Sequence, residues 1–356
     1  MSLVCEKCVE SDPGLQKFIV TRGQFSNNCS YCNIKSNSKK IELALLTNHV
    51  LNCLKESYQI KESKPEKYET LSSFLEKYFP SQEKNLLQDT ESLIRKEIGE
   101  VYLIEKMLIN TWDNFSNYTK TETRFFFSPK AKILEEAMKI IKNNNLIQKI
   151  KPIDKKRIYR ARAFTEGNRI VYDLRRMGPP EPEDTINISN RMSPPGVPVF
   201  YASFDKETVL SEISRKGREG CAYISEFHFL KEITIIDLTL SIDESLPSFF
   251  DIDKTKREKR SDLIFIQGLS AKLSEPIDKD GREHTDYVPT QILAEYTKNK
   301  GIHGIIYESS RNLKGKNIAL FFSQKNICVD KKNSIKPNIY LKFIKDNRTY
   351  SLPYGL

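Results

Sequence analysis

The sequence has few long apolar runs and few repetitive segments. Its 356 residues contain no stretch of about 18 apolar residues, the length needed to cross a bilayer. The N-terminal sequence MSLVCEKC lacks the charged and then apolar pattern of a secretory signal. No internal repeat and no extended low-complexity tract is present. Because 38% of the residues are hydrophobic, the chain can bury a full core. We expect a globular, cytoplasmic protein of two or three domains.

Positive charge is in excess but is not concentrated. Lysine and arginine number 57 against 47 aspartates and glutamates, which gives a net charge of +10. The lysines are spread along the whole chain rather than gathered in one stripe. We interpret this charge first as solvated surface, and a polyanionic partner such as a nucleic acid stays an alternative.

Four of the seven cysteines form two CxxC pairs near the N-terminus. Cys5 and Cys8 are separated from Cys29 and Cys32 by twenty residues, a spacing typical of two knuckles that place four thiolates around zinc. A redox CxxC needs only one pair, so structural zinc is the better interpretation. A closed four-thiolate site has no open coordination position. The metal would therefore fold this segment and take no part in catalysis.

The residues that follow have the pattern of a helical domain. Apolar residues recur at helical spacing over 40–56, 68–79 and 91–109, with little glycine or proline. The clearest helix is 128–141, with Ser128 as N-cap and proline at the first helical position. We predict four segments: a zinc-binding segment 1–40, a helical domain 41–150, a catalytic domain 151–335 and a C-terminal extension 336–356.

The second half of the chain changes to short strands between proline and glycine turns, which predicts a mixed α+β domain. The charged segment 251–262 is interpreted as a solvated loop. The expected strands are 157–164, 197–203, 233–240, 303–309 and 317–322, and the expected helices are 206–215, 262–274 and 289–299.

Three polar residues of this half lie at positions where a functional site could form. Glu212 falls at the margin of an apolar helix face, which suits a partly desolvated functional carboxylate and equally an ordinary helix-flank glutamate. Arg160 shares a strand face with apolar residues, as in an anion-binding groove or a wet sheet face. Ser309 ends a strand, where a hydroxyl can reach a cleft or serve no function.

Several blocks of this half resemble a known family. RIYRAR, then NRMSPPGVPVFYAS with ETVLSEI, then DYVPTQILAEY with GIIYESSRNLKGKNIALFF are similar, in this order, to the blocks of the RES domain family. The resemblance covers residues 155–325. It implies a fold related to ADP-ribosyltransferases and an NAD-consuming activity, usually as a bacterial toxin. The CxxC pairs and the helices resemble the HEPN-like extension that precedes some RES domains.

The residues that name the family, Arg, Glu and Ser, correspond to Arg160, Glu212 and Ser309, which the resemblance implies are catalytic. It also implies that Arg160, Arg191, Tyr201 and Ser309 bind NAD. One departure concerns the serine, because the family commonly has proline before it. Here Glu308 precedes two serines, so Ser310 is an alternative to Ser309.

Cleavage of NAD explains why one carboxylate would be enough. The nicotinamide–ribose bond breaks through an oxocarbenium-like state, and nicotinamide leaves neutral without a general acid. Glu212 would stabilise the positive sugar. Arg160 and Arg191 would hold the pyrophosphate, Tyr201 would stack on the nicotinamide ring, and Ser309 would hydrogen-bond the ribose or carboxamide.

The resemblance leaves the nucleophile open. Water or phosphate would make the protein an NAD glycohydrolase or phosphorylase, acting as a toxin or phage-defence effector. A protein nucleophile would make it an ADP-ribosyltransferase. The expected partners are NAD, with an antitoxin or regulatory protein and a homo-oligomer left open, and no membrane.

A ribonuclease or RNA-binding protein is the alternative from a different class. HEPN nucleases use an arginine followed four to six residues later by histidine, and none of the four histidines has arginine at that spacing. HEPN catalysis is therefore disfavoured, whereas RNA binding by the zinc and helical segments stays open. A serine hydrolase built on Ser309 lacks the GxSxG elbow.

Overall fold

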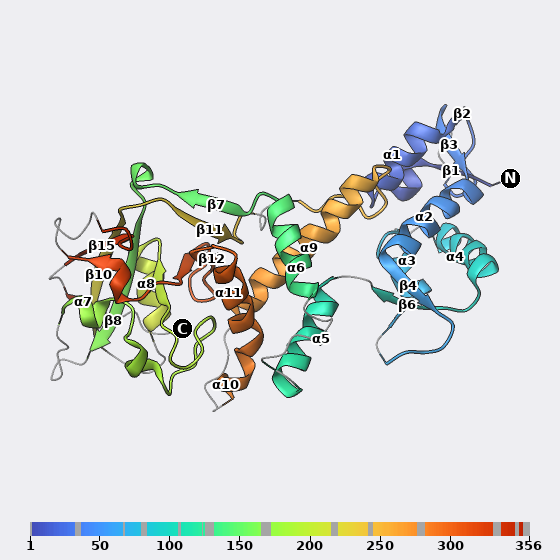
Figure 1. Ribbon diagram of the computed structural model, residues 1–356. Coiled ribbons are helices and arrows are strands. Elements are labelled where there is room, and N and C mark those ends of the chain that lie inside the picture. Colours follow the sequence, from blue (N-terminus) through green and yellow to red (C-terminus); the bar gives the residue numbers. More distant parts are fainter. Residues whose placement is uncertain are drawn as a thin grey trace. The chain divides into compact units, whose positions relative to one another are not determined.

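The computed structural model forms two compact units, each described here by itself (Figure 1). The first comprises Met1–Thr111 with Glu244–Phe265, and the second comprises Trp112–Asp243 with Ile266–Leu356. The four segments predicted from the sequence divide the chain differently and stay predictions. The structure describes residues 2–32, 37–66, 68–79, 84–105, 108–122, 124, 132–164, 172–214, 220–240, 245–275, 282–329, 336–345 and 349–351.

The first unit contains two small antiparallel sheets with helices packed beside them. One sheet has the order β1-β3-β2 and the other the order β4-β6-β5. The elements are β1 Leu3–Cys5, η1 Glu6–Val9, α1 Pro13–Arg22, β2 Gln24–Ser26, β3 Ser38–Glu42, α2 Leu43–Ser57, β4 Tyr58–Lys61, β5 Glu69–Thr70, α3 Leu71–Glu76, α4 Lys84–Ile98 and β6 Tyr102–Glu105.

The segment 244–265 joins the first unit although it follows residues 112–243 of the second. Asp12 caps α1 by accepting from the main-chain N–H groups of Gly14 and Leu15, each at 2.9 Å, and it also accepts from Ser248 Oγ at 2.6 Å. Phe249 and Phe250 are buried in the core of this unit. Burial of two aromatic side chains, which contact the rings of Phe74 and Tyr78, is a large hydrophobic gain, so it holds the segment in the core of this unit.

Two predictions for helices and loops in this unit are wrong. The helix predicted over 91–109 is interrupted, because Gly99 adopts a positive φ of 76° after α4 and Tyr102–Glu105 then pairs with β4. The loop predicted for 251–262 is instead largely helical, since α9 spans Lys254–Ser274. Lysine, arginine and glutamate are good helix formers, so a charged run forms an exposed helix as readily as a loop.

The second unit is built on a ten-stranded sheet of order β14-β15-β10-β8-β9-β13-β12-β11-β7, with β16 also paired to β10. This arrangement confirms the predicted α+β class. The strands are β7 Ile147–Ile150, β8 Arg157–Phe164, β9 Phe200–Ser203, β10 Cys221–Phe229, β11 Ile233–Asp237, β12 Gly304–Glu308, β13 Lys316–Leu320, β14 Ile327–Cys328, β15 Leu341–Ile344 and β16 Thr349–Ser351.

Helices and short 3₁₀ turns connect these strands. The predicted Ser128 cap lies outside the described residues, which resume at the start of α6. The elements are α5 Leu108–Thr121, α6 Lys132–Asn143, η3 Pro152–Asp154, α7 Leu174–Met177, η4 Pro182–Thr185, α8 Lys206–Ile213, α10 Glu283–Asp286, α11 Val288–Asn299 and η5 Gln324–Asn326. Among the described helices, none combines the length and the apolar character needed to cross a membrane.

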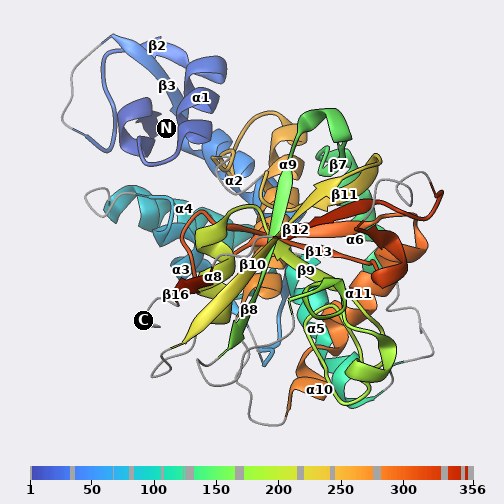
Figure 2. The ribbon, with the colours of Figure 1, turned by 90° about the vertical axis from the view of Figure 1, so that its left-hand side faces the viewer.

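Strand β8 lies next to β10 in the sheet (Figure 2) and separates two apolar clusters. Ile158 packs with Phe200 on one face, whereas Ala161 packs with Ile224 and with Val209 of α8 on the other. Successive side chains of a strand project to opposite faces. Helix α8 therefore covers the odd-numbered face of β8.

The sheet is weakly joined at its centre. Strand β8 pairs with β10 along its whole length but with β9 only at Tyr159 and Ser203. Strand β9 continues its pairing on the other side, with β13. The main chain of β9 before Ser203 is therefore not paired to β8, and a long side chain can enter between the two strands there.

Candidate active site

Glu212 lies in the last turn of α8, and its carboxyl group is fixed by one side chain from β13 and one from the residue that follows β12. Asp205 caps this helix by accepting from Thr208 N at 2.7 Å. Ser309 Oγ donates to Glu212 Oε1 at 2.6 Å, and Asn317 Nδ2 donates to the same oxygen at 2.7 Å. Among the described residues, none donates to Oε2. One carboxyl oxygen is thus held while the other is available to a ligand.

The residues that hold Glu212 are buried and aligned. Asn317 of β13 pairs with Ser203 of β9 on one side and with Tyr307 of β12 on the other, so the three side chains project from one face. Ser203 Oγ donates to Asn317 Oδ1 at 2.7 Å, which leaves the Asn317 amide nitrogen directed at Glu212. Ser203 and Asn317 are 2% and 5% exposed. Burial excludes competing water from these hydrogen bonds and strengthens them.

The structure distinguishes Ser309 from Ser310. Ser309 is buried, and its oxygen accepts from the main-chain N–H groups of Arg311 and Asn312, each at 3.1 Å. Since these donors point at its lone pairs, its proton goes to Glu212. Ser310 is exposed. Ser309 is therefore the serine that faces the carboxyl group.

Two tyrosines lie beside this network, with Tyr307 buried and Tyr201 half-buried. Tyr201 Oη accepts from Met192 N at 2.9 Å. Burial raises the pKa of Tyr201, and the nearby Tyr307 raises it further. Burial also raises the pKa of Tyr307, although Arg191 opposes that rise. Both phenols are thus neutral near pH 7 and present uncharged aromatic surfaces to the site.

Arg191 is held at the end of α9. Its Nη1 donates to the main-chain oxygen of Leu273 and its Nη2 donates to that of Glu275 at 2.6 Å. These carbonyls lie at the C-terminus of the helix, where a cation is favourable. The guanidinium carbon also lies 5.8 Å from the centre of the Tyr307 ring. Arg191 therefore borders the Glu212 network while it caps α9.

Arg160 is placed differently from Glu212. It belongs to the even-numbered face of β8, opposite to the face that α8 covers, and its guanidinium carbon lies 5.2 Å from the centre of the Phe200 ring. Its Nη1 donates to Tyr201 O at 3.4 Å, through the opening between β8 and β9. The structure does not bring Arg160 and Glu212 into contact.

Arg160 is a buried cation, 8% exposed. Burial lowers its pKa well below the usual value, and the neighbouring Arg162 lowers it further. Within the described ranges, no carboxylate pairs with either arginine. Burying an unpaired charge is costly, and a bound anion removes that cost. Arg160 is therefore suited to an anionic ligand group.

The four N-terminal cysteines meet in the first unit. Their sulfur atoms all lie within 4.8 Å of one another, with Cys5 and Cys8 at 3.7 Å, Cys5 and Cys32 at 3.5 Å and Cys8 and Cys29 at 3.6 Å. Four thiolates about 2.3 Å from one zinc ion would be about 3.8 Å apart at the corners of a tetrahedron. The cluster is thus compatible with a zinc knuckle.

Ser309 was predicted from the sequence, but Asn317 and Ser203, which complete the network around the carboxyl group, were not. Asn317 starts a run read only as a strand, NIALFF, and Ser203 ends another, VPVFYAS. A signal was present in the sequence. Each of these polar residues belongs to an otherwise apolar strand, and a polar side chain that is buried must find a hydrogen-bond partner.

Comparisons with known proteins agree with the expected family. The family model described as the RES domain matches residues 157–340, a region that contains all five predicted catalytic and NAD-binding residues. No curated protein matches the chain. A solved structure of the M. tuberculosis MbcT–MbcA toxin–antitoxin complex is 11% identical, with 62% of this chain and 93% of that chain covered. Its TM-score of 0.28 is too low to inform the fold.

The family match confirms the resemblance seen in the C-terminal half, whereas the cysteine cluster and the N-terminal helices lie outside it. Because the matched region extends over more than half of the chain, the protein belongs to the RES domain family.

Proposed function

We propose that the protein degrades NAD by cleaving the bond between nicotinamide and ribose, and that NAD depletion makes it a toxin or a phage-defence effector. Residues 151–335 would carry the reaction. The observation that supports this proposal is the Glu212 carboxyl group, with one oxygen held by Ser309 and Asn317 and the other open to a ligand. It lies within the region that matches a family associated with NAD consumption.

The reaction needs stabilisation of positive charge more than proton transfer. As the C–N bond breaks, its electron pair goes to nicotinamide, which leaves neutral, and positive charge grows on the ribose. Glu212 Oε2 would face this charge. Water would then add to the ribose carbon and release a proton to give ADP-ribose, or phosphate would add to give ADP-ribose-1″-phosphate. A carboxylate held by two hydrogen bonds needs no reorganisation at that moment.

The other predicted residues are assigned by their surroundings. Arg160 starts on the other face of the sheet from Glu212, so it would bind the pyrophosphate through the opening between β8 and β9, where its guanidinium reaches Tyr201 O and no described carboxylate neutralises it. Arg191 would add positive charge beside Tyr307 while still capping α9. Tyr201 would offer a neutral ring to the cationic nicotinamide. Ser309 would orient Glu212, and it would bind the substrate only by exchanging one of the three hydrogen bonds that its hydroxyl already makes.

Incubation of the full-length protein with NAD tests this function. We expect release of nicotinamide, measured by chromatography. In phosphate-free buffer we expect ADP-ribose as the second product. A faster reaction and ADP-ribose-1″-phosphate in phosphate buffer would identify a phosphorylase. Label transfer from NAD to a protein without free ADP-ribose would instead show an ADP-ribosyltransferase. Absence of nicotinamide release under all these conditions would reject the proposal.

Asn317→Ala removes one donor from Glu212, and we expect kcat for NAD cleavage to fall about tenfold or more with a smaller change in KM. Asn317→Asp places a second carboxyl group beside Glu212, and two such groups cannot both ionise easily. The acidic limb of the pH–rate profile should then move to higher pH. Asn338→Ala is the control, because the Asn338 amide donates to the main-chain oxygen of Lys325 and, among the described residues, to no site residue. An unchanged pH–rate profile in Asn317→Asp would argue against a role of Asn317 in positioning the Glu212 carboxyl group.

A further inference from the structure

The loop between β12 and β13, residues 309–315, contacts helix α8 in its last turn and at both of its ends. In the last turn, Ser309 donates to Glu212. At the C-terminal end, Arg311 Nη1 donates at 2.6 Å to the main-chain oxygen of Ser214, the residue at which the helix ends. Carbonyl groups at a helix C-terminus have no partner within the helix, and a cation is favourable there. Arg311 therefore caps α8.

At the N-terminal end, the loop reaches the residues that begin the helix. Asn312 Nδ2 donates to Thr208 Oγ1 at 2.7 Å, and Thr208 Oγ1 donates to Asp205 Oδ2 at 2.7 Å. Asp205 is the N-cap residue, which accepts from Thr208 N. Thr208 is fully buried. The loop is thus connected to the N-cap of α8 through two side-chain hydrogen bonds.

The loop is closed on itself and lies directly against the helix. Ser309 N donates to the main-chain oxygen of Gly315 at 2.8 Å, and Gly315 N donates to that of Asn312 at 2.9 Å. A Cβ atom at Gly315 would lie 2.4 Å from Thr208 Oγ1 and 3.0 Å from Thr208 Cγ2. A side chain at this position would push the loop away from α8, so glycine is needed for the close approach.

Helix α8 depends on such contacts because it has only eight residues. Isolated helices shorter than about 12 residues are marginal in water. Val209 packs with Ala161 and Ile224, which fixes the face that the helix turns to the sheet. Apolar contacts are non-directional, however, and they do not fix the helix along its own axis. The hydrogen bonds from the loop supply that constraint.

We infer that the 309–315 loop sets the position of the Glu212 carboxyl group, with Arg311 and Asn312 as positioning residues that act through α8. They hold opposite ends of a short helix, so loss of either lets one end move while Ser309 stays in place. A misplacement of about 1 Å can cost about 10²-fold in rate. The expected effect on NAD cleavage rests on the proposed function, whereas the effect on α8 does not.

Hydrogen exchange of the α8 amides, measured by mass spectrometry on the full-length protein, tests the inference without NAD. We expect exchange in residues 206–214 to be about tenfold faster or more in Arg311→Ala and in Asn312→Ala. Arg311→Lys keeps a cationic donor for the helix C-terminus and should regain most of the protection. Leu313→Ala is the matched control, since Leu313 belongs to the same loop and is 91% exposed, and it should exchange as the wild type does.

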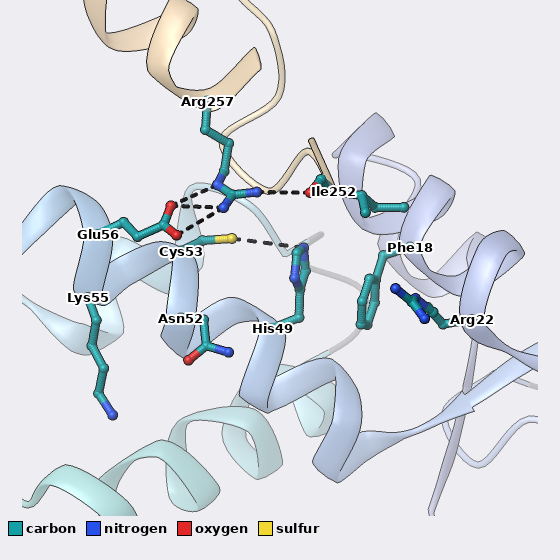
Figure 3. Close-up of a pocket in the computed structure, with 9 residues that line it drawn as sticks. All are labelled: Phe18, Arg22, His49, Asn52, Cys53, Lys55, Glu56, Ile252 and Arg257. Carbon is teal, nitrogen blue, oxygen red and sulfur yellow. Dashed lines mark hydrogen bonds and ion pairs between the residues drawn. The ribbon is translucent and has the colours of Figure 1, made fainter. Parts of the chain in front are cut away.

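Arg257→Ala is a second control, which measures the general cost of losing an arginine. In the first unit, Arg257 pairs with Glu56 at 2.9 Å and donates to the main-chain oxygen of Ile252 at 3.3 Å (Figure 3). Its replacement therefore also removes a hydrogen bond to a main-chain oxygen, but away from α8. Exchange in α8 should stay at the wild-type rate. Equal acceleration of α8 exchange in Arg257→Ala and Arg311→Ala would reflect a general loss of stability and would overturn the inference.

Kinetics of NAD cleavage test whether the loop serves the carboxyl group. We expect kcat to fall about tenfold or more in Arg311→Ala and in Asn312→Ala, with a smaller change in KM. In a Glu212→Gln background the same substitutions should have little further effect, because they act through the carboxylate. A merely structural role would lower the amount of folded protein and leave kcat per folded molecule unchanged.

The inference is overturned if α8 exchange is unchanged in Arg311→Ala or in Asn312→Ala, or if kcat per folded molecule keeps the wild-type value. It is also overturned if the loss of rate adds in full to that of Glu212→Gln. Wild-type protein that releases no nicotinamide would instead reject the proposed function. Hydrogen exchange would then decide the role of the loop alone, since faster α8 exchange in both variants supports it and unchanged exchange overturns it.

Discussion

Glu212→Gln should lower the rate of NAD cleavage by about 10²–10³-fold. Glutamine is nearly isosteric with glutamate, and its Oε1 can still accept from Ser309 and Asn317, whose donors lie 2.6 and 2.7 Å from the native oxygen. The substitution therefore preserves the packing of α8 but removes the negative charge that would face the ribose. The measurement is nicotinamide release at saturating NAD, with single-turnover kinetics to separate the chemical step from product release.

Glu207→Gln is the matched control for this experiment. Glu207 lies in the first turn of the same helix and is exposed, so its substitution makes the same chemical change away from the Ser309 network. We expect wild-type activity from it and wild-type thermal unfolding from both variants. A Glu212→Gln protein that is folded and cleaves NAD at the wild-type rate would remove Glu212 from the mechanism.

Local patterns predicted single elements of the C-terminal half well. The strand expected over 157–164 matches β8, and the helix expected over 206–215 matches α8 to within two residues. The position of Glu212 at the margin of the apolar face also predicted that it would be partly buried. These features depend on alternation and helical period, which are properties of a single segment.

Relations between segments were less predictable. The alternation of side chains along the predicted strand placed Arg160 on the same strand face as Ile158. Only the assembled sheet shows that α8 covers the opposite face. The contact between Glu212 and Asn317 depends on the register of β13 with β9 and on the end of α8, which are far apart in the sequence. The segment 251–262 was misread because its charge pattern fits both a loop and an exposed helix. The register between distant strands, and the face of a strand that a helix covers, can be determined only from the tertiary structure.

Removal of metal from the cysteine cluster should destabilise the first unit strongly. The CxxC pairs are the part of the N-terminus whose spacing alone predicted a spatial cluster, and the four sulfur atoms do lie within 4.8 Å of one another. Cys5 and Cys8 also belong to the buried core of this unit. Structural zinc sites contribute roughly 10–16 kcal/mol to the folding of isolated zinc-finger peptides. We expect about one zinc per chain by elemental analysis.

Cys8→Ser tests this expectation, because Cys8 is 1% exposed and its sulfur lies near both Cys5 and Cys29. We expect loss of zinc and a fall of about 10 °C or more in the unfolding temperature of the first unit, with the same fall in wild-type protein after chelation. Cys221→Ser is the control, since Cys221 lies outside the cluster, and it should keep both zinc and stability. Wild-type protein that contains no metal and unfolds identically with and without chelator would refute the zinc site. Because a four-thiolate site leaves no position open for substrate, chelated protein that is still folded should cleave NAD at the normal rate, which separates a structural metal from a catalytic one.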